Sequence, residues 1–456
     1  MTPVARIAGA PTVNVIGGGL AGTEAAWQLA QRGVRVRLIE MRPSRMTPAH
    51  HTGDLAELVC SNSLKSTDPN SAAGLLKYEL SALGSVVLEV AKWTCVPAGG
   101  ALAVDRAAFS TELTRRMESH PNIDVVRTEA DSIPEGRVIV ATGPLTSPAL
   151  ESALSSLVGD RLAFFDAAAP IVDADTLDRS VVFAQSRYDK GGSADYLNAP
   201  MSREEYAAFY DALVSARKVN PKEFERSDLF QACQPAEEVA RTGLDALRFG
   251  ALKPVGLTDP RTGERPWAVV QLRAENAAGT AYNLVGFQTN LAFPEQERVF
   301  HMIPGLRDAV FVRYGVMHRN TFVDAPRVLD ASLALREHPA VRLAGQLTGT
   351  EGYAEAAMSG LVAALNTWAE ITGAAGVVLP PTTAFGSLIA YATDPATTEY
   401  QPMHVNFGII PPLSERVRGK RERYAAYVER AHTDLAAWLG EHRELSASLP
   451  QAGPDE

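Results

Sequence analysis

Three glycines near the N-terminus have the spacing of a phosphate-binding turn. They lie in the hexapeptide Gly17-Gly18-Gly19-Leu20-Ala21-Gly22, between the apolar segment 13–16 and an alanine-rich stretch. In a Gly17-x-Gly19-x-x-Gly22 turn, the first glycine permits a tight bend and the second lets the backbone approach a pyrophosphate. The third lets a helix pack closely on a strand, and the free N–H groups at the helix start favour phosphate. An ordinary strand–helix turn that merely favours glycine would explain the triplet equally well.

Glu40 supplies the evidence that the glycines alone do not give. It ends the second apolar segment of the stretch 13–40 and lies 18 residues after Gly22, where an acceptor for a ribose hydroxyl is expected. The stretch 13–40 is therefore predicted to be a strand, helix and strand that bind a nucleotide. NAD, FAD and S-adenosylmethionine can all occupy such a unit, so the ligand has to be identified from other residues.

Two cysteines lie in settings that favour a thiolate. Cys60 is in the polar segment LVCSNSLKS beside Lys65, and Cys233 directly precedes an expected helix that begins at Pro235. A nearby ammonium group or a helix N-terminus lowers a thiol pKa, which makes redox or nucleophilic chemistry possible. The alternative is that both are small buried side chains. Cys95 has apolar and aromatic neighbours and is expected to be structural, and the three cysteines form no zinc pattern.

One segment is strongly basic although the chain has a formal net charge of −10. Five cations fall within eight residues: Arg416, Arg418, Lys420, Arg421 and Arg423. They could contact phosphates, or they could form a solvated face of the helix expected over about 415–439. Arg313 and Arg319 are further candidates for phosphate contact. His318, between aromatic residues and arginines, is either a hydrogen-bonded core histidine or a stacking residue.

The elements that would position these residues indicate an α/β protein with a divided nucleotide domain. The segment 137–143 resembles a buried strand that enters a turn at Gly143, and 341–345 again leads into glycines, Gly345, Gly349 and Gly352. Between them, helices expected at 203–216 and 235–243 alternate with strands at 268–273 and 281–285. We predict a nucleotide domain over 12–165 and 325–440, an inserted α+β domain over 166–324 that carries Cys233, and a disordered tail over 441–456.

Composition fits a protein without a membrane anchor. Apolar residues make up 46% and charged residues 21% of the chain, and the N-terminus shows no secretion-signal pattern. The uncharged run 371–393 contains a Pro-Pro pair and three glycines, which favour a buried loop and helix over a membrane span. The sparse, odd number of cysteines fits a reducing cytoplasm.

Six strings, in chain order, resemble one enzyme family: GGGLAGTEAA, LVCSNSLKS, LRFGALKPVGL, YNLVGFQTNL, FVRYGVMHRNTF and AGQLTGTEGYAEAA. Over about residues 12–410 the chain is similar to the folate- and FAD-dependent tRNA uracil-5 methyltransferases. A more distant relative is the large FAD protein of tRNA wobble-uridine modification, whose extended C-terminal helical region is absent here.

The resemblance implies a glutathione-reductase-like fold in which Gly17–Gly22, Glu40, Gly143, Gly345, Gly349 and Gly352 bind FAD. It implies that Cys60 lies near the flavin ring and that Cys233 attacks C6 of uracil. The implied reaction methylates C5 of the T-loop uridine, position 54 of tRNA. Methylenetetrahydrofolate would be the one-carbon donor, and FAD reduced by NADPH or NADH would carry the methylene and supply a hydride.

The same resemblance leads to further expectations about partners. They are stacking of folate on His318, contact of tRNA with the basic segment 416–423, no metal, no membrane partner and a cytoplasmic location. The oligomeric state is not determined by the sequence, and a monomer is slightly favoured.

Three other functions stay open at this point. A flavin-dependent disulfide oxidoreductase would use Cys60 and Cys233, although their spacing is not of the CxxC type. A non-catalytic FAD- and tRNA-binding protein would not need either thiol. An adenosylmethionine methyltransferase is disfavoured by the second glycine-rich strand–helix segment near 345.

Overall fold

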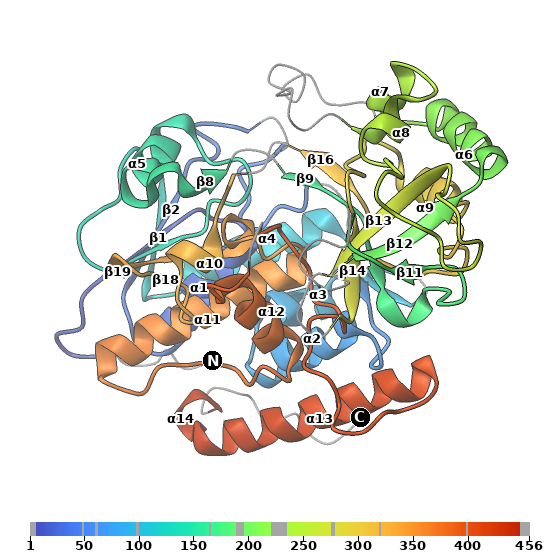
Figure 1. The fold of residues 1–456 in the computed structure, drawn as a ribbon. Helices are drawn as coiled ribbons and strands as arrows, with labels where there is room; N and C mark the ends of the chain where they lie inside the picture. The colour runs from blue at the N-terminus through green and yellow to red at the C-terminus, as the bar shows by residue number, and fades with distance from the viewer. Residues whose placement is uncertain are drawn as a thin grey trace. The chain divides into compact units, whose positions relative to one another are not determined.

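The computed structural model describes residues 6–47, 50–59, 63–96, 100–163, 166–187, 196–219, 235–274, 279–318, 321–397 and 400–446. The chain divides into two compact units, one formed by Met1–Phe164 with Asn320–Glu456 and the other by Phe165–Arg319 (Figure 1). Each unit has its own sheet, and both combine helices with strands, as the α/β prediction requires.

The first unit is built on a six-stranded sheet of order β18-β19-β7-β1-β2-β6. The five strands from β19 to β6 run parallel, and β18 pairs antiparallel with β19. The strands are β18 (Ala334–Leu335), β19 (His338–Leu343), β7 (Val138–Val140), β1 (Val13–Ile16), β2 (Val36–Glu40) and β6 (Ile123–Arg127). Parallel strands need crossover connections, and a sheet of this kind is covered by helices, so its strands are largely apolar.

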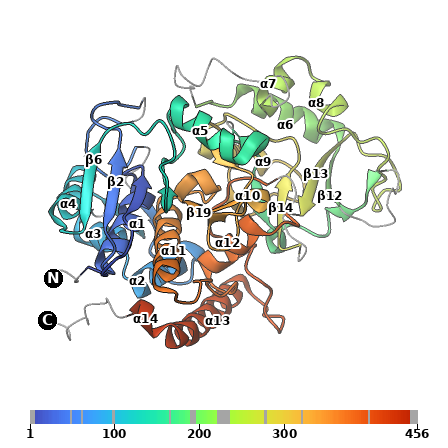
Figure 2. The ribbon, with the colours of Figure 1, turned by 90° about the vertical axis from the view of Figure 1, so that its left-hand side faces the viewer.

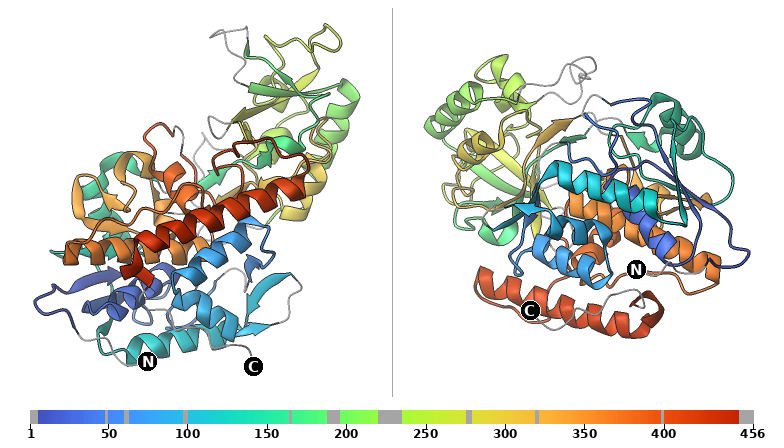
Figure 3. Two further views of the ribbon diagram at one scale, coloured as in Figure 1. Left: turned by 90° about the horizontal axis from the view of Figure 1, so that it is seen from below. Right: turned by 180° about the vertical axis from the view of Figure 1, so that it is seen from behind.

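Two helix pairs join segments of the first unit that are far apart in the sequence. α1 (Leu20–Gln31), which follows the glycine turn, lies side by side with α11 (Tyr353–Thr372) from the far end of the chain (Figure 2). The close approach depends on Gly360, because a Cβ there would overlap the carbonyl oxygen of Ala21. α13 (Lys420–Glu441) lies along α2 (Ala72–Ala82), where the rings of Tyr78 and His432 are 3.9 Å apart (Figure 3).

The other elements of the first unit are short strands and connecting helices. They are β3 (Ser63–Ser66), α3 (Val86–Trp93), β4 (Cys95–Val96), β5 (Ala101–Val104), α4 (Arg106–Ser119), α5 (Pro148–Val158), η1 (Gly159–Arg161), β8 (Leu162–Ala163), β17 (Phe322–Val323), α10 (Ala325–Val328), η5 (Gly345–Thr348), α12 (Ala384–Thr393) and α14 (Arg443–Ser446). No helix among the described residues is long and apolar enough to cross a membrane.

The second unit contains an antiparallel sheet of order β11-β12-β13-β14-β10-β15. Its elements are β9 (Asp166–Ala168), β10 (Ile171–Asp173), η2 (Ala174–Thr176), β11 (Phe183–Ala184), β12 (Tyr196–Met201), α6 (Arg203–Ser215), α7 (Ala236–Arg241), α8 (Ala246–Phe249), β13 (Ala268–Ala274), β14 (Ala281–Leu284), α9 (Phe293–Phe300), β15 (Phe311–Arg313) and β16 (Val316–His318). α6 begins at a capping box formed by Ser202 and Glu205, and it buries Tyr206, Phe209 and Leu213 in the core of this unit.

Glu79 joins α2 to the start of α12. Its buried carboxylate accepts the N–H groups of Ala384 at 2.6 Å and Phe385 at 3.0 Å. These are two of the donors that a helix start leaves without an intrahelical partner. Burial raises the pKa of Glu79 to about 7, against the opposing effect of the two backbone hydrogen bonds.

This pKa predicts a specific pH dependence of stability. Glu79 keeps its proton to higher pH in the folded than in the unfolded protein, so the folded state binds more protons between pH 4.5 and about 7. The free energy of unfolding should therefore fall as the pH rises through that window, by about 1–3 kcal/mol relative to Glu79→Gln. Urea denaturation of both proteins at about pH 5 and pH 7 measures the change. A wild-type minus variant difference that is constant with pH would mean that Glu79 is ionised throughout.

Candidate active site

The glycine turn and Glu40 lie at one edge of the parallel sheet. Gly17 follows β1, Glu40 ends β2, Gly143 follows β7 and Gly345 follows β19. Because β19, β7, β1 and β2 are adjacent and parallel, all four positions are at the carboxyl ends of neighbouring strands. Ligands of open α/β sheets bind at this edge.

The three fingerprint glycines differ in what surrounds them. Gly17 has φ 101°, and a Cβ there would lie 2.5 Å from the carbonyl oxygen of Ala141. A Cβ at Gly22 would overlap the carbonyl oxygen of Gly17, so the backbone that follows β7 excludes a side chain at Gly17 and the turn itself excludes one at Gly22. A Cβ at Gly19 would meet no protein atom within 4 Å. The protein's own packing therefore does not require glycine at residue 19, whereas close approach of a ligand would.

Glu40 is held as an ionised acceptor beside this turn. Its Oε2 accepts the N–H of Gly18 at 2.7 Å, and its Oε1 accepts the backbone N–H of Arg42 at 2.9 Å and the Arg42 Nε–H at 2.8 Å. Burial acts to raise the pKa of Glu40, but the charge and hydrogen bonds of Arg42 and the bond from Gly18 hold it below its usual value. Each carboxylate oxygen has two lone pairs, so Oε2 has an acceptor position for a ribose hydroxyl.

Arg42 is a structural partner that the sequence analysis did not identify. Its side chain is 2% exposed and also donates to Glu57 at 3.1 Å. A lone arginine two residues after an acidic residue gives no sequence signal of burial, so only the position of Glu57 in the folded chain reveals the pairing.

The second glycine segment lies beside the first. Gly345 has φ 73°, and a Cβ there would be 3.1 Å from the Cβ of Ala21, at the start of α1. Gly349 has φ 77°, and a side chain at this position would overlap the ring of Tyr400. Gly143 has φ 67° and open space around its absent Cβ. Gly19 and Gly143 are partly exposed and leave open space at the carboxyl edge, and the buried Gly345 and Gly349 form the adjoining turn. These four glycines, the glycine cradle, fit the extended phosphates of a dinucleotide.

Lys65 connects β3 to the start of α11. Its ammonium group donates to Oε1 of Glu355 at 3.1 Å, and Glu355 is 1% exposed. Gly352 lies against this pair, because a Cβ there would overlap the Glu355 carboxylate. Lys65 has φ 67°, which is uncommon for a residue with a side chain and is typical of constrained functional segments. The ion pair thus links the polar segment that contains Cys60 and Lys65 to the start of α11.

Lys77 adds a second cation to this cluster. It donates to the carbonyl oxygen of Ser66 at 2.8 Å, and burial lowers its pKa to about 8 although Glu355 acts to raise it. The sequence analysis noted Lys65 as a neighbour of Cys60 but did not predict Glu355 or Lys77, which approach only in the folded chain.

The catalytic residues expected from the sequence are largely outside the described structure. Cys60 and Cys233 both fall outside the described residues, and for His318 the backbone of β16 is described but the side chain is not. Cys95 is exposed and not disulfide-bonded. The described residues contain no group of three or more histidine, cysteine, aspartate or glutamate side chains that could hold a metal ion.

The basic segment differs from the predicted single helix. α13 begins at Lys420 rather than near 415, because Gly419 has φ 87° and ends the preceding loop, so Arg416 and Arg418 lie before the helix. Lys420, Arg421 and Arg423 lie in its first turn, where the Glu422 carboxylate folds back over Gly419. Arg416, Arg418, Lys420 and Arg421 are exposed, and none of them forms an ion pair with another described residue.

The prediction that Arg313 contacts phosphate was wrong. Its side chain is 6% exposed and donates to the carbonyl oxygen of Ala169 at 3.0 Å, within the core of the second unit. Arg319 lies outside the described residues.

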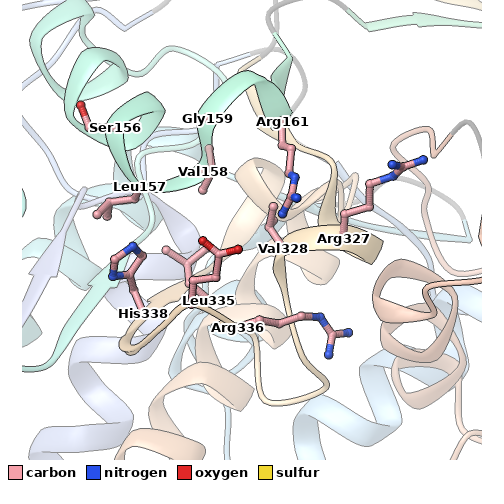
Figure 4. Close-up of a pocket in the computed structure, with 11 residues that line it drawn as sticks. Ser156, Leu157, Val158, Gly159, Arg161, Arg327, Val328, Leu335, Arg336 and His338 are labelled. Carbon is pink, nitrogen blue, oxygen red and sulfur yellow. The ribbon is translucent and has the colours of Figure 1, made fainter.

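The first unit contains a cavity of about 310 Å³ (Figure 4). It is lined by Ser156, Leu157, Val158, Gly159, Arg161, Arg327, Val328, Leu335, Arg336, Glu337 and His338. The β18–β19 turn is at the amino end of β19, the opposite sheet edge from Gly345. Arg327 pairs with Asp324 at 3.1 Å, Arg336 donates to Thr393 O at 3.1 Å, and both extend away from the centre in Figure 4. The cavity is therefore not part of the nucleotide site.

Comparison with known proteins agrees with this geometry. The family model for glucose inhibited division protein A matches residues 12–375. A methylenetetrahydrofolate–tRNA-(uracil-5-)-methyltransferase TrmFO of Moorella thermoacetica is 56% identical over 92% of this chain and 96% of its own length. The TrmFO of Geobacter sulfurreducens is 54% identical over 94% of this chain and 98% of its own length.

Solved structures support the fold. The GidA of Aquifex aeolicus aligns with a TM-score of 0.50 at 17% identity, covering 96% of this chain and 76% of that protein. A similarity at this identity supports the architecture alone, and it confirms the predicted Rossmann-like fold. The family-model match and the extensive identity together show that the chain belongs to the GidA family and, within it, to the TrmFO group.

Proposed function

We propose that this protein methylates C5 of the T-loop uridine of tRNA, position 54, with methylenetetrahydrofolate as the one-carbon donor and FAD as cofactor. NADPH or NADH reduces the flavin. The observation that carries the proposal is identity above one half, over nearly the full length of both chains, to proteins named as methylenetetrahydrofolate–tRNA-(uracil-5-)-methyltransferases.

The first unit has the features that FAD requires. The backbone N–H groups of Gly19 and Gly22, and of Leu20 and Ala21 at the start of α1, would face the pyrophosphate. Gly17 and Gly18 would form the bend, because their N–H groups donate to the carbonyl oxygen of Ile39 and to Glu40. Glu40 would accept a ribose hydroxyl, and Gly143 would leave room along the rest of the cofactor. Gly345, Gly349 and Gly352 would shape the adjoining backbone, because their absent Cβ positions face Ala21, Tyr400 and Glu355. When bound, FAD supplies the carrier for the one-carbon unit and the hydride that completes the methyl group.

The second unit carries the proposed nucleophile, Cys233. Uracil C5 is a weak nucleophile, and addition of the Cys233 thiolate to C6 converts the ring to an enolate-like form that can attack carbon through C5. After loss of the C5 proton, elimination of the thiolate restores the C5–C6 double bond and the enzyme. The uracil must leave its stack for this attack, so the tRNA is expected to be bound with that base extruded.

Cys60 and His318 have supporting roles in this proposal. Cys60 acts as the base at C5 or holds the methylene between steps. Lys65, which follows Cys60 in the same polar segment, is fixed by Glu355 and provides the positive charge that favours a Cys60 thiolate. His318 stacks on the folate. The same proposal places the protein in the cytoplasm, and it involves neither a metal nor a membrane.

The basic segment 416–423 is the proposed contact for tRNA phosphates. A helix start carries a partial positive charge, so Lys420, Arg421 and Arg423 in the first turn of α13 are electrostatically unfavourable for the isolated helix. Exposed cations in such a position favour an anionic partner over a merely solvated helix face.

Neutralising this segment should weaken RNA binding in a salt-dependent way. The triple variant Arg416→Gln, Arg418→Gln, Arg421→Gln should bind tRNA more weakly and reduce the slope of log K against log salt by about 2–3, because counterions are no longer released at three contacts. Filter binding at several salt concentrations measures the slope. The matched control replaces Arg106, Arg115 and Arg298, which are in helices elsewhere. Equal slopes for wild type and the basic-segment variant would mean that segment 416–423 is a solvated surface that does not contact tRNA phosphates.

The activity itself is tested with the purified protein. We expect a flavin absorption spectrum and release of tritium from C5-tritiated uridine in tRNA, dependent on methylenetetrahydrofolate and on a reduced nicotinamide. Turnover of NADPH with small disulfides and no tritium release would instead support the disulfide oxidoreductase. A flavin spectrum with tRNA binding and no turnover would support the non-catalytic protein.

A further inference from the structure

Phe249 presents an aromatic ring on the surface of the second unit. It is the last residue of α8, and its side chain is 72% exposed. Leu247 of the same short helix is 1% exposed and belongs to the hydrophobic core of the unit, so the helix is anchored while the ring points outward. Single exposed apolar residues are ordinary, so the exposure of Phe249 acquires meaning only from its neighbours.

Those neighbours form a ladder of guanidinium groups and aromatic rings. The Arg248 guanidinium lies 3.9 Å from the ring centre of Trp267 and 5.5 Å from that of Phe249. The Arg203 guanidinium also contacts Trp267, 5.2 Å from its ring centre. Arg248 also donates from Nε to the carbonyl oxygen of Trp267 at 2.9 Å, which fixes its plane.

Two paired strands support the ladder. Arg203 follows β12 and Trp267 precedes β13, and the ends of these strands are in register at Met201 and Ala268. The elements that carry the ladder, α6, α8, β12 and β13, are all in the second unit (Figure 1). A platform held this way loses little conformational entropy when a partner binds, which increases affinity for a flat ligand.

Charge favours an anionic partner over an apolar protein surface. Arg203 and Arg248 place their guanidinium groups on the Trp267 ring, and the carboxylate that pairs with Arg248 is Asp245, whose Oδ1 is 3.7 Å from Arg248 Nη1. Glu204 and Glu205 follow Arg203 in the first turn of α6, and Glu205 is held by the backbone N–H of Ser202. Aromatic rings beside guanidinium planes are the surface on which unpaired bases of single-stranded RNA stack, while the cations attract the adjacent phosphates.

We propose that Phe249, with Arg248 and Trp267 behind it, is a stacking platform for an unpaired base of the tRNA substrate. This inference rests on the proposed function, which requires an unstacked loop base. α8 packs against α7, and α7 begins three residues after Cys233 in the sequence. The platform thus belongs to the same part of the chain as the proposed nucleophile, and it positions RNA without taking part in the chemical steps.

The test separates stacking from charge. Phe249→Ala and Phe249→Leu should each weaken tRNA binding about 10-fold, because loss of base–aromatic stacking has an effect of this order. The slope of log K against log salt should not change, because no phosphate contact is lost. Phe249→Tyr and Phe249→Trp keep a ring and should bind within about twofold of wild type. Filter binding over a salt series, with the FAD-loaded protein and unmodified tRNA, measures both quantities.

Leu244→Ala is the matched control, because Leu244 is 52% exposed and lies just before α8. It should bind tRNA as wild type does. If wild type methylates tRNA and Phe249→Ala binds tRNA with unchanged affinity, the platform is wrong and the proposed function stands. If wild type itself neither binds nor methylates tRNA, the proposed function fails. If wild type self-associates and Phe249→Ala does not, while tRNA affinity is unchanged, the ring makes a contact between protein molecules. That result would also overturn the stacking platform.

Discussion

Replacing Cys233 with alanine is expected to abolish methyl transfer to tRNA and to leave the purified protein yellow. Without the thiolate, C6 of uracil has no nucleophile and C5 is not activated, so the rate should fall by at least about 10³-fold. The glycine cradle and Glu40 belong to the first unit, and Cys233 belongs to the second, so FAD retention should be unaffected. Tritium release from C5-labelled tRNA measures the rate, and the visible spectrum measures the flavin.

Cys95→Ala is the control for loss of a thiol. Cys95 is exposed, not disulfide-bonded and located in the short strand β4, and its replacement should leave methyl transfer unchanged. A fully active Cys233→Ala protein would contradict the nucleophile assignment. Loss of flavin from that variant would show that the residue supports the fold rather than the reaction.

The second large effect is expected at Gly19. Its absent Cβ faces open space in the protein, so Gly19→Ala should leave the fold intact. If backbone at this position approaches the FAD pyrophosphate, the added methyl group meets the ligand, and such overpacking costs about 1–3 kcal/mol, or roughly a 5- to 150-fold loss of FAD affinity. Flavin content after dialysis measures the loss, and a thermal melt of the apoprotein shows whether the fold is preserved.

Gly440→Ala is the matched control, because its Cβ would also meet no atom within 4 Å and it lies within α13. It should retain FAD and gain slightly in helix stability. Gly22→Ala should behave differently from both, since its Cβ overlaps the carbonyl oxygen of Gly17 and would disturb the turn in the apoprotein as well. If Gly19→Ala retains the wild-type flavin content, the Gly17–Gly22 turn is an ordinary strand–helix turn that does not bind the cofactor.

The features that the sequence predicted well are local ones. The strand at 13–16, the turn at Gly17–Gly22 and the strand that ends at Glu40 depend on short-range patterning and on the steric demands of one bend, and the structure has them with the same limits. The start of α13 was misplaced, because the pattern over 415–439 gave too little weight to Gly419, whose positive φ separates Arg416 and Arg418 from the helix.

Features that depend on distant parts of the chain could not be predicted from local patterns. Lys65 and Glu355 are 290 positions apart in the sequence. Arg42 and Glu57 are joined by an irregular loop, whose sequence has no helix or strand periodicity from which their contact could be predicted. The Arg203–Trp267–Arg248 ladder likewise requires the β12–β13 register before the three side chains can meet. In each case the residue types were visible in the sequence, but their association follows from tertiary packing.

Isotopic labelling identifies the origin of the new methyl carbon. The purified protein is incubated with unmodified tRNA, NADPH and methylenetetrahydrofolate that carries ¹³C in its methylene group, and the digested tRNA is analysed by mass spectrometry. We expect 5-methyluridine at the T-loop position with ¹³C in its methyl group. Formation of 5-methyluridine without ¹³C, or only after unlabelled S-adenosylmethionine is added, would contradict the proposed one-carbon donor.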